Sequence, residues 1–236
     1  SPCEWTLDLG GHMIDVSNYS RAISIASDDV TLTVKNGKIM GGQDGAWVGI
    51  GSVETGQYKN IVLNMENVDL TASGDYGIVC NGTSTNIDIN LKGGSVTAEN
   101  GIGIYFPPAD STLTIDGTAV SGQTGVAVKG GTVTVRGDAA VTGSGAANTP
   151  SEGNTSGVNN TGDAFYVEGN YGRDIKVDIQ DGTFESVNGK AVQMLFEDNA
   201  SGTKEIGVTS GEFSSEVPKE YIVSGMTAAS DRKSVV

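Results

Sequence analysis

The sequence predicts an all-β chain folded as a right-handed parallel β-helix of about eight coils. Three observations lead to this expectation: one apolar spacing recurs along the chain, a turn rich in glycine or asparagine follows most instances, and no long stretch has the 3.6-residue apolar period of a helix. A single unit of roughly 25 residues cannot bury its apolar face, whereas units stacked through parallel strands about 4.8 Å apart can. Parallel crossovers favour the right hand.

Each unit begins with two apolar residues one position apart and continues, after a turn, to a third apolar residue. Successive units lie 20 to 31 residues apart, except for a step of 44 residues between Val135 and Ile179. The eight expected units are Leu7-Leu9-Ile14, Leu32-Val34-Ile39, Leu63-Met65-Leu70, Ile89-Leu91-Val96, Leu113-Ile115-Val120, Val133-Val135-Val141, Val177-Ile179-Phe184 and Ile206-Val208-Phe213.

A second short strand closes each unit. We expect these strands at residues 22–25, 47–50, 77–80, 101–104, 125–128, 164–167, 191–194 and 221–223. Alternation then predicts one inward row, formed by Ile50, Cys80, Ile104, Val128, Val167 and Met194. A β-sandwich is the alternative fold, since short strands with regular turns also suit it. Sandwich strands need not repeat one apolar spacing, which favours the β-helix.

The chain is expected to form one domain over residues 1–236. The step of 44 residues contains a loop insert at 143–162 that has almost no large apolar residues and predicts a mobile surface loop. Whether this loop is functional or a tolerated insertion stays open. A closing segment is expected at about 209–236.

The coil pattern resembles the pectin-lyase-like superfamily of right-handed β-helices over the whole chain. The segments 181–186 (DGTFES) and 210–217 (SGEFSSEV), followed by Glu220-Tyr221-Ile222, are similar to the endings of β-helix modules in large surface proteins of gut Firmicutes. This resemblance implies a bacterial cell-surface, extracellular location. It also suggests adhesion, and it carries over no catalytic residue.

Composition excludes several classes of function. The formal net charge is −15, whereas nucleic-acid binding needs a basic surface. One histidine, His12, and two cysteines exclude a zinc site rich in His and Cys. For a noncatalytic module, neither a metal nor a cofactor is expected. No run of 18 apolar residues occurs, and no membrane insertion is expected.

An outward row of charged residues is the first candidate site. It follows the second apolar residue of each unit and comprises Gly10, Lys35, Glu66, Lys92, Asp116, Arg136, Gln180 and Thr209. Lys35 to Arg136 alternate in sign, which predicts a ladder of ion pairs that fixes coil register. The alternative is a polysaccharide lyase site made of Arg136, Lys92, Glu66 and Asp116, with carboxylates that hold calcium. Alternation of charge favours the ladder.

Aromatic residues near the second strands are the second candidate site. Aromatic rings form sugar platforms and protein hot spots, and the candidate ligand-binding residues are Trp47, Tyr105, Phe106, Tyr166, Tyr171 and Phe196. We expect them at outward or loop positions. The competing interpretation is that loops fold these rings over the edges of the core.

The sequence therefore predicts a noncatalytic extracellular β-helix module of a larger multidomain bacterial surface protein. It would adhere to a host glycan or protein, or act as a rigid spacer. The alternative is a polysaccharide lyase or glycoside hydrolase acting on an acidic or complex polysaccharide. Of the polygalacturonase signature motifs only an isolated Asp28-Asp29 pair occurs, which argues against that enzyme class.

Overall fold

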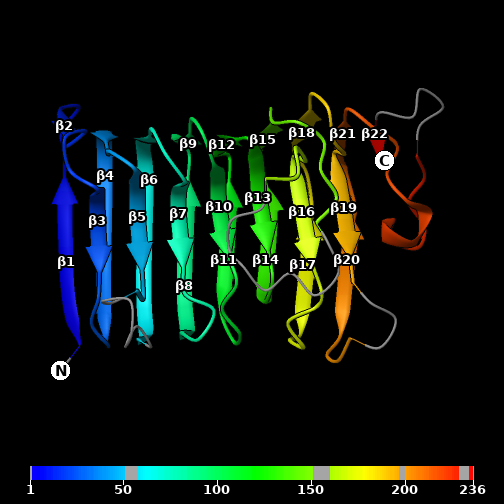
Figure 1. Cartoon of the computed structure of the whole chain (residues 1–236), viewed down its shortest axis with the longest axis horizontal. Coiled ribbons are helices and arrows are strands. Elements are labelled where there is room, and N and C mark those ends of the chain that lie inside the picture. The colour runs from blue at the N-terminus through cyan, green and yellow to red at the C-terminus, as the bar shows by residue number, and fades with distance from the viewer. Residues whose placement is uncertain (1, 51–57, 151–159, 197–199, 229–233, 236) are drawn as a thin grey trace.

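The computed structural model describes residues 2–50, 58–150, 160–196, 200–228 and 234–235. Over these residues the protein is an all-β, solenoid-like stack of parallel strands, compatible with a parallel β-helix. The stack is elongated, with β1 at one end and the C-terminal segment at the other (Figure 1). The strands make two sheets, a large sheet and a small sheet.

The large sheet contains two parallel ladders, which share the long strands β4 and β6. The first ladder comprises β1 (Cys3–Asp8), β4 (Val30–Met40), β6 (Lys59–Ala72), β8 (Thr85–Lys92), β11 (Thr112–Asp116), β14 (Gly131–Arg136), β17 (Ile175–Ile179) and β20 (Lys204–Val208). The second adds β2 (Met13–Asp15), β9 (Ser95–Ala98), β12 (Ala119–Gly122), β15 (Ala140–Gly143), β18 (Thr183–Ser186) and β21 (Gly211–Phe213). A short antiparallel strand, β22 (Ser234–Val235), pairs with β21.

The small sheet is the third ladder of the stack. It comprises β3 (Arg21–Ile25), β5 (Asp44–Val48), β7 (Tyr76–Cys80), β10 (Ile102–Phe106), β13 (Thr124–Val128), β16 (Phe165–Glu168) and β19 (Val192–Leu195). Each of these strands follows a strand of the second ladder, so the chain visits the three ladders in turn before it moves to the next level.

The core lies between the ladders and is built from the inward residues that the apolar spacing predicts. Val34, Met65, Leu91, Ile115, Val135, Ile179 and Val208 are register partners on successive strands, and all are buried. The second row from Ile39 to Phe213 is in register as well. The coil alignment from residue 30 onward is therefore confirmed for the large sheet.

The alignment of the first strand is wrong by two residues. Leu7, not Leu9, pairs with Val34, and Asp8 takes the place expected for Gly10. The turn after β1 contains Gly10 and Gly11, both with positive φ, and is one or two residues longer than the other turns between the first and second ladders. Because strand periodicity is two, a shift of two residues keeps every side chain on the same face, so alternation alone cannot detect it.

The small sheet differs from the expectation in three places. The inward partner of Cys80 on β5 is Val48 rather than Ile50, and the inward partner of Val128 on β10 is Phe106 rather than Ile104. Both errors are again two-residue shifts. The strand expected at 221–223 is absent from the described residues there, which instead form a 3₁₀ turn, η1 (Lys219–Tyr221), and one bridge between Ile222 and Val208.

Glycines mark the entry into the small sheet because the second ladder passes close by. A Cβ on Gly77 would lie 2.4 Å from the carbonyl oxygen of Gly103 and 2.6 Å from Cγ1 of Val96. Gly103 meets the equivalent atoms of Gly125 and Val120 one level further along. Only glycine therefore lets the second and third ladders approach this closely.

Only the two ends of the predicted insert at 143–162 fall within the described residues; residues 151–159 lie outside them. At the C-terminal end, Thr161 is buried and its N–H donates to Oγ1 of Thr124, 2.8 Å away. Thr161 is therefore part of the stack rather than of a surface loop.

The C-terminal segment covers the end of the core. Phe213 stacks on Phe184 with ring centroids 5.1 Å apart, and Val217 and Tyr221 are buried in the same core. These contacts place apolar side chains over the last level of the solenoid, where the core would otherwise meet water.

Candidate functional site

The outer face of the small sheet carries most of the predicted aromatic residues. The register brings one outward row together, formed by Trp47, Val79, Tyr105, Ala127, Tyr166 and Gln193. Val79, Tyr105, Ala127 and Tyr166 are buried although they point away from the core, and they form a second apolar cluster with Ile102. Trp47 and Tyr76 pack against this cluster and stay partly exposed. We call this surface the aromatic face.

A buried ion pair lies at one edge of the aromatic face. Lys129 directly follows β13 and Glu168 ends β16, and Lys129 Nζ lies 2.8 Å from Glu168 Oε2. Each side chain is only 2% exposed. The described residues give the Glu168 carboxylate no hydrogen bond of good geometry, so its attraction to Lys129 is what compensates its burial.

Two tyrosines, Tyr105 and Tyr171, pack around Lys129 of this ion pair, and Tyr76 lies beside Tyr105. Lys129 Nζ lies 5.5 Å from the ring centroid of Tyr105 and 5.0 Å from that of Tyr171, both within cation–π range. The Tyr105 and Tyr171 side chains share a hydrogen bond, and the rings of Tyr76 and Tyr105 lie 5.8 Å apart. The rings therefore have fixed positions relative to one another and to the charge beneath them.

Tyr171 belongs to the loop that follows β16 and is held by Arg173. The Arg173 guanidinium lies 5.1 Å from the Tyr171 ring, and its Nη1 donates to the carbonyl oxygen of Pro107. This loop connects β16 to β17, and the Arg173 hydrogen bond ties it to the residue that follows β10, so a partly exposed tyrosine lies over the edge of the aromatic face.

The tyrosines are poor general bases. Burial raises the pKa of Tyr76 to about 12, and burial also raises the pKa of Tyr105, Tyr166 and Tyr171 above the ordinary value of 10.0. All four phenols are thus protonated at neutral pH and can donate hydrogen bonds. They are unsuited to the proton abstraction that a lyase needs.

Trp47 lies at the N-terminal edge of the aromatic face. Its Nε1 donates to Asp44 Oδ2, 2.8 Å away, and the guanidinium carbon of Arg21 lies 3.1 Å from the indole centroid. Burial is the main cause that raises the pKa of the Asp44 carboxyl. The indole is held by a hydrogen bond at its edge and by a cation over its face, so it is preorganised.

The remaining predicted aromatics take different places. The expectation that Phe106 faces outward or into a loop is wrong, since it is fully buried in the core between the ladders. Tyr166 faces outward as predicted but is 1% exposed, and its hydroxyl has no hydrogen-bond partner among the described residues. Phe196 directly follows β19 and is 48% exposed.

Sequence reasoning missed Tyr76, Lys129 and Glu168. A signal for the two charged residues was present, because each directly follows an inward valine, Val128 or Val167, that the alignment had already paired. Two opposite charges at one position of adjacent strands predict an ion pair. No sequence signal indicated that the pair would be buried.

The charged row of the large sheet has the predicted register from Lys35 to Arg136. Two ion pairs form in it: Lys35 Nζ lies 3.3 Å from Glu66 Oε2, and Arg136 Nε lies 3.0 Å from Asp116 Oδ2. Lys92 stands between Glu66 and Asp116 and makes no ion pair with the described residues. The charged row therefore forms two separate ion pairs rather than one continuous ladder of ion pairs.

The described residues contain neither a cluster of metal-binding side chains nor a helix that could span a membrane. There, no three side chains of Asp, Glu, His or Cys gather closely enough to hold a metal ion. None of the helical segments in the described ranges has the length and apolar character to cross a bilayer.

No family model, curated protein or solved structure matches the chain.

Proposed function

We propose that the protein is a noncatalytic module of a bacterial surface protein that binds a host glycan or protein through its aromatic face. In this proposal the solenoid is a right-handed β-helix of about eight coils, similar to the pectin-lyase-like superfamily. It stands outside the cell and is one part of a larger chain. The burial of Phe213, Val217 and Tyr221 supports the assignment of residues 209–236 as the closing segment.

The observation that carries this proposal is that rings on the aromatic face are both partly exposed and held in fixed positions. Trp47, Tyr76 and Tyr171 are partly exposed, and each is held by neighbours that are themselves fixed. Rings that are preorganised lose little conformational freedom when a ligand stacks on them. The buried Tyr105 and the Lys129–Glu168 ion pair lie beneath the exposed tyrosine rings and pack against them.

The chemistry of the candidate groups supports binding over catalysis. The phenols are protonated at neutral pH because burial raises their pKa. In the charged row, Asp116 is neutralised by Arg136 and Glu66 by Lys35, so neither carboxylate is left uncompensated for a calcium ion. A rigid spacer shares this chemistry but needs no exposed preorganised rings.

Binding of the purified chain to an array of host glycans and extracellular proteins tests the proposal. We expect saturable binding to one class of ligand, which is recovered chemically unchanged after incubation. A folded chain that binds nothing on a broad array would indicate the spacer function instead.

A further inference from the structure

The last strand of the first ladder has an open edge. β20 pairs with β17 on one side only. The Thr209 N–H donates to the carbonyl oxygen of Ile179, and Thr203 accepts from the N–H of Ile175, so Thr203 and Thr209 point their backbone groups at β17. Backbone direction alternates along a strand that is paired in parallel. The backbone groups of Lys204, Ile206 and Val208 therefore point away from β17.

Residues 222 and 223 of the chain already pair with one part of this edge. The Val223 N–H donates to the carbonyl oxygen of Val208 at 3.0 Å, and Ile222 forms a parallel bridge with Val208. Further along the edge, no described strand pairs with Lys204 or Ile206. The backbone N–H and C=O groups of these two residues are thus free to accept another strand.

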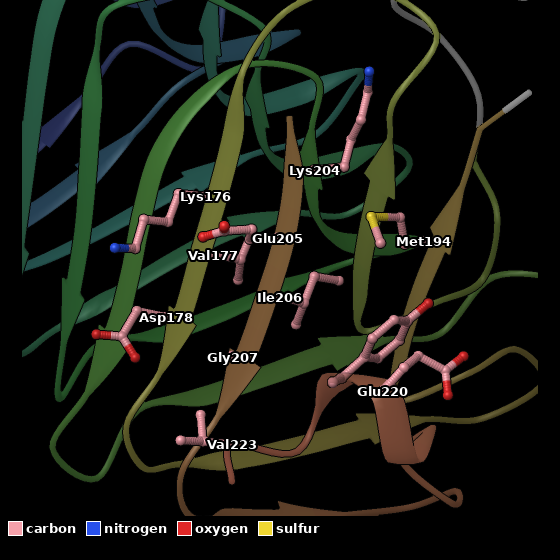
Figure 2. Close-up of a pocket in the computed structure, with 11 residues that line it drawn as sticks. Lys176, Val177, Asp178, Met194, Lys204, Glu205, Ile206, Gly207, Glu220 and Val223 are labelled. Carbon is pink, nitrogen blue, oxygen red and sulfur yellow. The ribbon is translucent and has the colours of Figure 1, made fainter. Parts of the chain in front are cut away.

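A cavity of about 500 Å³ lies along the open edge of β20. Figure 2 shows β20 between Lys176 and Asp178 on one side and Met194 and Glu220 on the other. Buried Ile206 and Tyr221 contribute apolar surface to the cavity, together with Val177 and Met194. Gly207 contributes no side chain, so the space beside the strand stays open.

We propose that this open edge is a docking site for an extended strand of another polypeptide, which pairs with β20 in parallel and continues the ladder. Unpaired backbone donors and acceptors in alternation select an extended peptide backbone over a sugar or a helix. An apolar side chain of the incoming strand would face Ile206 and fill the cavity. The next outward side chain would stand beside Glu205.

Charge specifies that outward residue as lysine or arginine. In the existing ladder Lys176 is the register partner of Glu205, and at an earlier level the register partners Lys35 and Glu66 form an ion pair. A second copy of this chain suits the site poorly, because β1 in the same register would place Glu4 beside Glu205. Residues 222–223 and β22 also occupy the neighbouring edges. This site is separate from the aromatic face, and its test does not depend on the proposed function.

The probe is a synthetic peptide with an amidated C-terminus, Asp-Ile-Lys-Val-Asp, which copies residues 174–178 and ends before the position opposite Val208 that Ile222 occupies. The same sequence already pairs with the other edge of β20, with Lys176 opposite Glu205 and Val177 opposite Ile206. We expect saturable binding of the labelled peptide to the folded chain, measured by fluorescence anisotropy. Backbone amides of Lys204 and Ile206 should exchange more slowly in the complex, because both gain acceptors.

Two matched changes make the test specific. In the proposed register the peptide's second Asp donates its N–H to the carbonyl oxygen of Ile206, whereas the Val N–H points away. N-methylation at that Asp should weaken binding about tenfold or more, and N-methylation at Val should weaken it far less. A peptide with Glu in place of Lys should bind weakly to the parent and regain affinity for the Glu205→Lys variant.

Three results would overturn the proposal: no saturable binding at about 1 mM peptide, equal effects of the two N-methylations, or unchanged exchange at Lys204 and Ile206 in the complex. Failure here leaves ligand binding at the aromatic face unaffected, since the two surfaces share no residue.

Discussion

Lys129 and Glu168 face each other across adjacent strands of the small sheet, with Nζ and Oε2 2.8 Å apart and each side chain 2% exposed. The pair lies on the outside of the solenoid yet is shielded from water. A buried charge without its partner is strongly unfavourable. The ion pair therefore links the integrity of the aromatic face to the stability of the fold.

Removing one member of the pair should destabilise the protein more than removing both. Lys129→Met leaves the Glu168 carboxylate buried and uncompensated, and we expect a loss of about 3–5 kcal/mol in the free energy of unfolding. The double variant Lys129→Met/Glu168→Leu should regain most of it, because two apolar side chains replace the ions. Urea titration measures all three proteins. If the double variant is as unstable as the single one, the pair is not an isolated buried couple.

A new charge on β14 should destabilise the protein strongly where the side chain points into the core and only weakly where it points to solvent. Val135→Asp places a carboxylate in the core beside Ile179, which should cost several kcal/mol or prevent folding. Thr132→Asp is the matched control, because Thr132 is exposed on the same strand and its register partner is Lys176. Similar thermal melts of the two variants would contradict the register.

The charged row should respond to charge reversal as a ladder. Glu66→Lys puts three lysines side by side, Lys35, the new one and Lys92, and we expect a loss of about 1 kcal/mol that added salt reduces. Glu99→Lys, at an exposed turn, is the control. A loss that does not depend on salt would show that the row contributes through packing rather than charge.

Calcium and a polyuronate distinguish the ladder from a lyase site. We expect calcium to leave the melting temperature nearly unchanged and polyuronate incubation to give no unsaturated products that absorb in the ultraviolet. Product formation that needs calcium and disappears in Arg136→Ala would assign the row to a lyase.

The buried carboxyl of Asp163 should give a characteristic pH dependence. Burial raises its pKa above the ordinary 3.8, so the folded state binds this proton more tightly than the unfolded state. Stability from this group is therefore greater at low pH and is lost as the pH rises through the raised pKa. Asp163→Asn keeps an acceptor for the Lys190 N–H, and its stability relative to the parent should be higher at pH 7 than at pH 3.5. The opposite trend in paired denaturation curves would contradict the assigned cause.

Much of the large sheet could be predicted from the sequence because its apolar spacing is a direct consequence of stacking. The rows through Val135 and Phe184 were predicted correctly. The small sheet was less predictable, since its strands are short and a two-residue shift preserves alternation. Phe106 was misplaced for that reason, and Ile50 took the position of Val48.

The candidate site was predictable in its composition and less so in its burial. Trp47, Tyr105, Tyr166 and Tyr171 do lie together on or over one outer face. Their exposure depends on which loops fold over that face, and the strand pattern holds no information on this. For Tyr105, which is 6% exposed, the competing expectation of a ring folded over the core edge describes its burial better.

The central claim is that the aromatic face binds the ligand and does not convert it. The most direct measurement is the affinity of the array-selected ligand for the parent chain and for Tyr171→Ala, Trp47→Ala and Met13→Ala, by calorimetry with product analysis. The first two variants should bind about tenfold more weakly or worse, and Met13→Ala, which alters a side chain 55% exposed on the first level of the stack, should bind as the parent does. Unchanged affinity in both aromatic variants, or chemical conversion of the ligand by the parent, would contradict the account.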